Sequence, residues 1–120
     1  MVKLITIFKR KPGISRDVFI RHWQQVHARI AVEDRDFWSR VRKYVQNYVT
    51  SESQQPAWDG VVELWFDSQA TLDAAFSGEE TKKGLIADLD NFVDQTSMIS
   101  VVTEENILYD SRSSSITYAA

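Results

Sequence analysis

Apolar residues in the first quarter of the chain change from a continuous run to a helical period. Residues 2–8, VKLITIF, are rich in β-branched and aromatic side chains and end at the turn signal KRKPG, which predicts a strand and a loop. Ser15 is placed to cap a helix that we expect to continue to about residue 33. Four apolar residues at spacings of four, three and four form its predicted buried stripe: Phe19, Trp23, Val26 and Ile30.

The middle of the chain predicts two more strands. The charged segment 33–43 is either a short second helix or an extension of the first. In RKYVQNYVT (42–50), tyrosine and glutamine alternate with valine and asparagine, which is the period of a strand. After the polar loop 51–60, VVELWFD (61–67) is apolar on both faces and predicts a third strand.

The second half predicts another helical region and a last strand. Ser68 is placed to cap a helix, and a second helical segment fills residues 79–94. Residues 97–108, SMISVVTEENIL, predict the fourth strand. The serine-rich tail is expected to extend from the domain, although Ile116 and Tyr118 are apolar enough to dock on it.

The element order β-α-β-β-α-β predicts an α+β, ferredoxin-like fold with an antiparallel four-stranded sheet and two helices on one face. The strands are nevertheless apolar on both faces, as Ile5 and Ile7 show on one side of the first strand and Leu4 and Phe8 on the other. A second copy of the chain would cover the open face most simply. We therefore predict a homodimer whose two sheets close face to face into a dimeric α+β barrel.

Length and composition narrow the class of protein. At 120 residues the chain is expected to form one domain, residues 1–108, followed by the tail, residues 109–120. A net charge of −3 argues against a nucleic-acid partner, and the absence of cysteine excludes disulfides and thiolate catalysis. No run approaches the roughly 20 apolar residues of a membrane span, and the basic residues follow the first apolar run instead of preceding it. We expect a cytoplasmic protein with no membrane partner.

Five fragments of the chain together resemble the EthD family of the dimeric α+β barrel superfamily, over roughly residues 3–108. They are LITIFKRKPGIS, FIRHWQQVHA, YVQNYV, WDGVVELWFDS and ADLDNFVD. The resemblance implies a substrate pocket between the sheet and its helices and a histidine acid or base on the first helix. Similar small barrels include polyketide dehydratases, decarboxylases and cyclases, lactone isomerases, and oxygenases that need no metal or flavin. Many relatives carry histidine where this chain has Tyr48, so its chemistry is expected to differ from theirs.

His27 is the first catalytic candidate. It lies roughly 70° from the centre of the predicted stripe, at the edge of the buried face, and imidazole is well suited to proton transfer at neutral pH. The alternative is a structural histidine bonded to a backbone carbonyl. His22 lies at the opposite edge of the stripe, so we expect the two rings to point apart and not to share a metal.

Glu63 is the second candidate, because a carboxylate among apolar strand residues is either paired or has a raised pKa. It would orient His27, or alternatively pair with Lys3 or another cation. Asn47 and Tyr48 point to opposite faces of their strand, and either could bind a carbonyl oxygen. The remaining predicted substrate-binding residues are aromatic or next to the stripe: Trp23, His22, Tyr44, Trp65 and Phe66.

These residues predict a cofactor-independent lyase or isomerase acting on a hydrophobic aromatic, polyketide-like or lactone substrate by dehydration, decarboxylation or isomerisation. His27 would move the proton, and Glu63, Tyr48 and Asn47 would orient the substrate. No nucleotide cofactor is predicted, because the chain lacks the GxGxxG and P-loop motifs, and the absence of a GxSxG motif leaves serine chemistry without support. No metal is predicted, because the two histidines are not spaced to share one. The alternatives are a cofactorless or haem-dependent oxygenase, and a non-catalytic ligand-binding protein of a catabolic or biosynthetic pathway.

Overall fold

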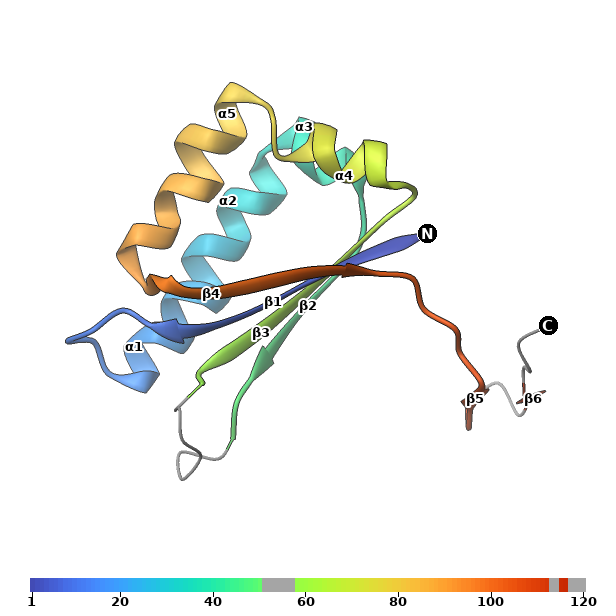
Figure 1. Ribbon diagram of the computed structural model, residues 1–120. Coiled ribbons are helices and arrows are strands. Elements are labelled where there is room, and N and C mark those ends of the chain that lie inside the picture. Colours follow the sequence, from blue (N-terminus) through green and yellow to red (C-terminus); the bar gives the residue numbers. More distant parts are fainter. Residues whose placement is uncertain (51–57, 113–114, 117–120) are drawn as a thin grey trace.

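A computed structural model describes residues 1–50, 58–112 and 115–116 of the chain (Figure 1). The first half contains β1 (Val2–Arg10), α1 (Arg16–Arg21), the π-helical segment η1 (His22–His27), α2 (Ala28–Glu33), α3 (Arg35–Arg40) and β2 (Val41–Tyr48). The second half contains β3 (Gly60–Phe66), α4 (Gln69–Ala75), α5 (Glu79–Thr81), the π segment η2 (Lys82–Ile86), the 3-10 turn η3 (Leu89–Asn91) and β4 (Val93–Thr103). The predicted order of strands and helices is confirmed.

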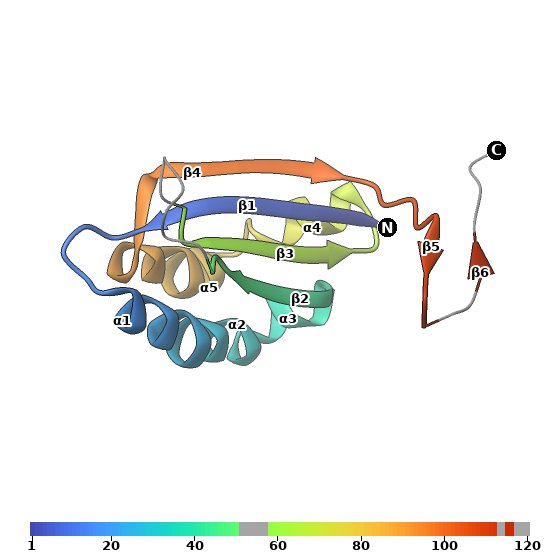
Figure 2. The same cartoon turned by 90° about the horizontal axis from the view of Figure 1, so that it is seen from below.

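The four long strands form one antiparallel sheet in the order β2-β3-β1-β4. The helices all lie on one face of this sheet and leave the other face open (Figure 2). Together these features make the α+β, ferredoxin-like fold that the sequence predicts. β2 and β4 are the two edge strands, so the space beneath the sheet is bounded by them on either side.

Side chains alternate between the two faces of the sheet. Leu4, Thr6 and Phe8 of β1 point toward the helices, whereas Lys3 and Ile5 point to the open face. Beneath the sheet, one core cluster is centred on aromatic residues near α3 and α4, and the other on aromatic residues near α1 and η1. The first includes Phe37, Leu64 and Phe66, and the second includes Phe8, Phe19, Trp23 and Phe92.

The first helix begins as predicted but turns differently in its middle. Ser15 caps it by accepting a hydrogen bond from the Val18 amide at 3.2 Å. The residues it buries are spaced by four (Phe19, Trp23, His27 and Ala31), whereas Val26 is 44% exposed. A spacing of four is longer than the 3.6 residues of an α-helical turn. The π turn of η1 has i to i+5 hydrogen bonds and so contains more residues, which keeps residues four apart on one face. The predicted stripe through Val26 is therefore wrong.

The fourth strand also has different bounds from those predicted. β4 begins at Val93, inside the segment expected to be helical, and ends at Thr103. The tail forms a short separate pair, β5 (Tyr109–Asp110) with β6 (Ser115–Ile116), beyond the end of the main sheet (Figures 1 and 2). Tyr118 lies outside the described residues, and the assignment of 1–108 as the domain stays a prediction. Within the described ranges, no helix is long and apolar enough to span a membrane.

Candidate active site

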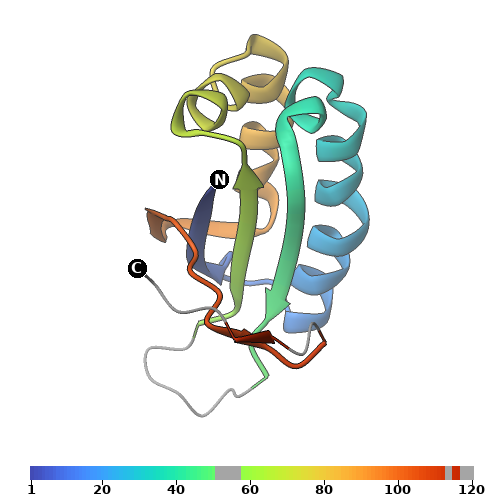
Figure 3. The ribbon, with the colours of Figure 1, turned by 90° about the vertical axis from the view of Figure 1, so that its right-hand side faces the viewer.

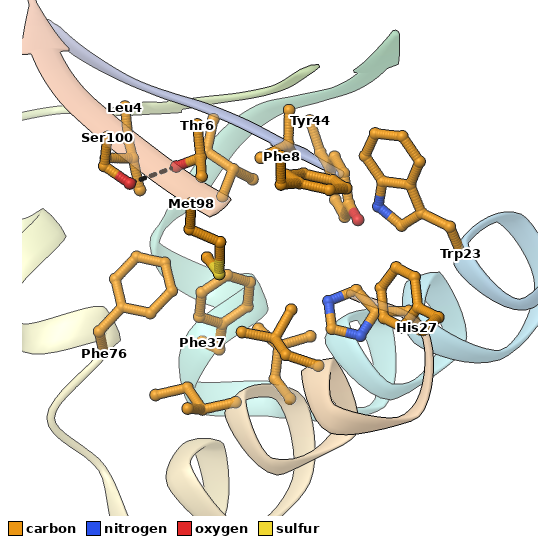
Figure 4. A pocket seen from close by; sticks show the side chains of 16 residues that line it. Leu4, Thr6, Phe8, Trp23, His27, Phe37, Tyr44, Phe76, Met98 and Ser100 are labelled. Atoms are coloured by element: carbon orange, nitrogen blue, oxygen red, sulfur yellow. Dashed lines mark hydrogen bonds between the residues drawn. The ribbon is translucent and has the colours of Figure 1, made fainter. Parts of the chain in front are cut away.

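A cavity of about 250 Å³ lies between the helix face of the sheet and the two helical regions (Figure 4). Most of its wall is apolar, and its polar groups belong to His27, Tyr44, Thr6, Ser100 and the indole N–H of Trp23. The hydroxyls of Thr6 and Ser100 are 2.7 Å apart and share one hydrogen bond. The full lining is Leu4, Thr6, Phe8, Trp23, His27, Phe37, Tyr44, Val62, Leu64, Phe76, Leu85, Ile86, Leu89, Phe92, Met98 and Ser100.

His27 ends the π segment and is held by a buried carboxylate. Its Nδ1 lies 2.7 Å from Asp88 Oδ2, and both residues are more than nine-tenths buried. Since the carboxylate can only accept, Nδ1 carries the proton, and Nε2 presents a lone pair on the side of the ring that faces the cavity. Burial lowers the pKa of His27 below its ordinary value, although the hydrogen bond and charge of Asp88 act in the opposite direction. The ring is thus held in the tautomer whose unprotonated nitrogen faces the cavity.

Asp88 accepts hydrogen bonds from three side chains. In addition to His27, His22 Nε2 lies 2.9 and 3.0 Å from its two oxygens, and Asn91 Nδ2 lies 2.9 Å from Oδ1. Burial by itself would raise the pKa of Asp88, but the bonds from Asn91, His27 and His22 together hold it below its ordinary value. The Asp88 carboxylate is therefore an anion that fixes the orientation of the His27 ring.

The shared carboxylate corrects the prediction that His22 and His27 point apart. In an α-helix, residues five apart are separated by roughly 140° around the axis. The hydrogen bonds of η1 instead join residues five apart, so these two rings lie on the same side and reach one carboxylate. Among the residues described, no group of three or more histidines, cysteines or acids has a geometry that could hold a metal ion.

Tyr44 supplies a second functional group. Its hydroxyl points into the cavity (Figure 4) and accepts a hydrogen bond from Gln46 Nε2 at 3.0 Å. Burial raises the pKa of Tyr44, although hydrogen bonds from Gln46 and Trp23 act against this, so the phenol stays protonated at neutral pH. No described residue accepts the Tyr44 proton, which leaves it available to a ligand oxygen.

Gln46 is itself fixed, because its Nε2 donates to the Trp23 carbonyl oxygen at 3.0 Å and its Oε1 accepts from Tyr48 at 2.7 Å. Tyr48 therefore lies behind the cavity wall, where it also packs edge-on against Trp23. It supports the site without lining it. Phe66 is fully buried between Phe37 and Phe76 and likewise does not line the cavity.

Glu63, Asn47 and Trp65 lie on the open face, so they do not meet His27. Glu63 is 2.8 Å from Lys3 Nζ and accepts from Asn47 Nδ2 at 2.9 Å. The hydrogen bond from Lys3 lowers the pKa of Glu63, which matches the paired alternative and not the role of orienting His27. Trp65 lies 4.8 Å from the ammonium groups of both Lys3 and Lys43.

Asp88, which does orient His27, was missed from the sequence. The sequence feature that could have identified it is an acid within an apolar helical stripe. Leu85 precedes Asp88 by three residues, and Leu89 and Phe92 follow it by one and four. Of the other predicted substrate-binding residues, Trp23 and Tyr44 line the cavity, whereas His22 contacts Asp88 from outside it.

Comparison with solved structures supports the fold. An ethyl tert-butyl ether D (EthD) family protein from Bacillus halodurans is 19% identical with a TM-score of 0.66, covering 88% of this chain and 99% of its own. HapK from Hahella chejuensis is 14% identical with a TM-score of 0.68, covering 100% of this chain and 99% of its own. A dimeric ferredoxin-like protein of unknown function from Bacteroides fragilis is 17% identical with a TM-score of 0.60, covering 87% of this chain and 95% of its own.

Among curated proteins, none matches the chain significantly. The sequence profile of the EthD domain matches residues 11–96, a range that includes η1, Tyr44 and Asp88. This match spans more than half of the chain, and the chain belongs to the EthD domain family.

Proposed function

We propose that this protein is an enzyme that removes a proton from a hydrophobic aromatic, polyketide-like or lactone substrate. The observation that carries the proposal is the buried His27–Asp88 pair, whose free Nε2 faces an apolar cavity. The structural alternative is a ring bonded to a backbone carbonyl, whereas His27 is bonded to a buried carboxylate. Here one nitrogen is held by a carboxylate and no described residue bonds the other, which is the arrangement of a general base.

The same groups suit an enolate-forming reaction. His27 Nε2 takes a proton from a carbon next to a carbonyl group, and the electrons of that C–H bond move onto the carbonyl oxygen. Tyr44 donates its phenolic proton in a hydrogen bond to this oxygen, and Asp88 stabilises the imidazolium. The enolate then expels a β-hydroxyl as water, with a proton from His27, or is reprotonated at another carbon. In decarboxylation of a β-keto acid, His27 Nε2 first takes the proton of the substrate's carboxylic acid, the carboxylate loses CO₂ to give the same enolate, and His27 returns the proton to carbon.

A carbon acid that serves any buried base tests this proposal without knowledge of the natural substrate. With 5-nitrobenzisoxazole, His27 would remove the C3 proton as the N–O bond breaks, which yields a coloured cyanonitrophenolate. We expect His27→Ala to slow this reaction by about 10² to 10⁴. A loss of less than about tenfold would refute the role of His27 as the base.

The same assay separates the alternatives. An oxygenase requires O₂ for turnover of its own substrate, whereas proton transfer proceeds at an unchanged rate under argon. A binding protein would return candidate aromatic and lactone ligands unchanged and would not accelerate the benzisoxazole reaction above His27→Ala. Either outcome would replace the lyase or isomerase assignment.

We also propose that the chain works as a homodimer through the open face of its sheet. Ile99 and Val101 on the edge strand β4 are 56% and 50% exposed on this face, next to the partly buried Ile5 and Ile7. The protein from Bacteroides fragilis with this fold is dimeric. Val101→Lys should shift the sedimentation coefficient toward that of the monomer, whereas Val26→Lys, on a comparably exposed helix position, should not. A wild-type monomer at micromolar concentration would refute the dimer.

A further inference from the structure

A second hollow of about 190 Å³ adjoins the cavity at Tyr44. It is lined by Ala28, Val32, Trp38, Tyr44 and Gln46, between α2 and β2, which run side by side in Figure 3. Val32 is 48% exposed and Trp38 is 37% exposed, so the hollow opens to the surface. Tyr44 is the one residue that lines both spaces.

The cavity runs beneath the sheet from one edge strand toward the other. At its β4 side it is lined by Met98 and by Ser100, which is exposed, and this side is its opening. Figure 4 shows Ser100 and Phe76 at one end and Tyr44 with Trp23 at the other. A ligand that enters past Ser100 therefore meets the Tyr44 ring at the far end, and this ring also lines the hollow.

The Tyr44 ring is held in this closing position by several contacts. Its hydroxyl is bonded by Gln46, which is in turn fixed by Tyr48 and the Trp23 carbonyl. On the hollow side, the Trp38 ring packs against it with centroids 6.3 Å apart. The phenol is thus a fixed wall, and a smaller side chain would join the two spaces into one passage beneath the sheet.

We infer that Tyr44 sets the maximum length of the ligand, and that the hollow is a latent subsite for an apolar tail. This inference rests on the proposed function only in taking an aromatic ligand for the cavity. The walls beyond Tyr44 are apolar except for Gln46, which suits an alkyl chain.

The test measures binding of a homologous series, 4-ethylphenol to 4-nonylphenol, by isothermal titration calorimetry. In the wild-type protein we expect the affinity to rise about fourfold per methylene, and then to stop rising at a limiting chain length. Tyr44→Phe keeps the ring and should keep this limit. Tyr44→Ala, or Tyr44→Leu if the alanine variant does not fold, should move the limit to chains at least three carbons longer. An unchanged limit in the variant that folds, or binding of no alkylphenol at all, would overturn the inference.

A second substitution shows where the longer tail lies. Trp38→Glu places a carboxylate in the hollow and should abolish the extended limit of the Tyr44 variant, while leaving 4-ethylphenol binding to the otherwise wild-type protein within about twofold. An extended limit that survives Trp38→Glu would overturn the assignment of the hollow. These measurements involve no turnover, so loss of the proposed base function would show separately, in the benzisoxazole rate of His27→Ala.

Discussion

Replacing Asp88 with asparagine tests the site more sharply than removing His27, because it changes charge with little change of shape. The carboxylate accepts from three donors, whereas an amide offers one acceptor oxygen and two N–H donors. If the amide oxygen faces His27, the charge-assisted bond becomes a neutral one. If the amide nitrogen faces it, His27 must carry its proton on Nε2 and can no longer act as the base.

The size of the effect follows from the geometry. Two unit charges about 4 Å apart interact by about 4 kcal/mol at the effective dielectric constant of about 20 that suits protein sites. The 2.7 Å bond between His27 Nδ1 and Asp88 Oδ2 places the imidazolium and the carboxylate at such a separation. Loss of most of this stabilisation in the transition state corresponds to a fall in rate of about 10² to 10³. In serine protease triads the corresponding change lowers kcat by about 10⁴.

The assay is the benzisoxazole rate for the wild type, Asp88→Asn and the matched control Asp90→Asn, whose carboxylate is exposed two residues away. We expect the control to retain its rate within about twofold. Circular dichroism and a thermal melt establish that Asp88→Asn is folded. A folded Asp88→Asn protein that retains more than about a third of the wild-type rate would show that the carboxylate does not serve His27.

Three further predictions concern stability. Unfolding free energy should decrease as the pH is lowered from about 6.5 toward the depressed native pKa of His27, because the unfolded chain binds a proton there and the folded one does not; this decrease should be absent in His27→Gln. Gly60→Ala should lower the free energy of unfolding by about 1–3 kcal/mol in urea titrations, since its new Cβ would lie 2.7 Å from the Trp23 ring. Gly84→Ala is the matched control: it meets only an ordinary contact at 3.4 Å and should stabilise its helix by up to about 1 kcal/mol, so equal losses at both glycines would contradict the packing argument. Ser15→Ala should cost about 1 kcal/mol through loss of the helix cap, and an unchanged urea midpoint would show that the cap contributes nothing.

The elements that could be predicted are those decided by local sequence. Ser15 and Ser68 both cap helices where expected, because a hydroxyl before a helical stripe satisfies an otherwise free amide. The strand around Glu63 was equally clear from its alternation. The side chain that pairs with Glu63 was not clear from the sequence, because the face of the sheet on which Glu63 lies depends on which strands are its neighbours. Pairing with β1 brings Lys3 within reach of Glu63 on the open face, whereas His27 lies beneath the other.

The part of the site that sequence analysis missed depends on one turn of backbone. Reading η1 at the α-helical period places Val26 inside and separates the two histidines. The π turn reverses both conclusions, because it exposes Val26 and brings His22 and His27 to the same carboxylate. Periodicity cannot reveal such a turn, since the residues that form it, HWQQVH, have no composition that favours it over an α turn.

The π turns and the cavity are linked by more than position. An isolated π turn is less favourable than an α turn and persists where surrounding contacts compensate for it. In η1 the compensation is visible: the two histidines bind Asp88, and both of their rings pack against Phe92 at centroid distances of 4.9 Å. η2, on the facing helix, contributes Leu85 and Ile86 to the cavity wall. The least regular helical turns of the fold, η1 and η2, thus both contribute to the cavity wall, where the proposed function requires the His27 ring to be held in one orientation.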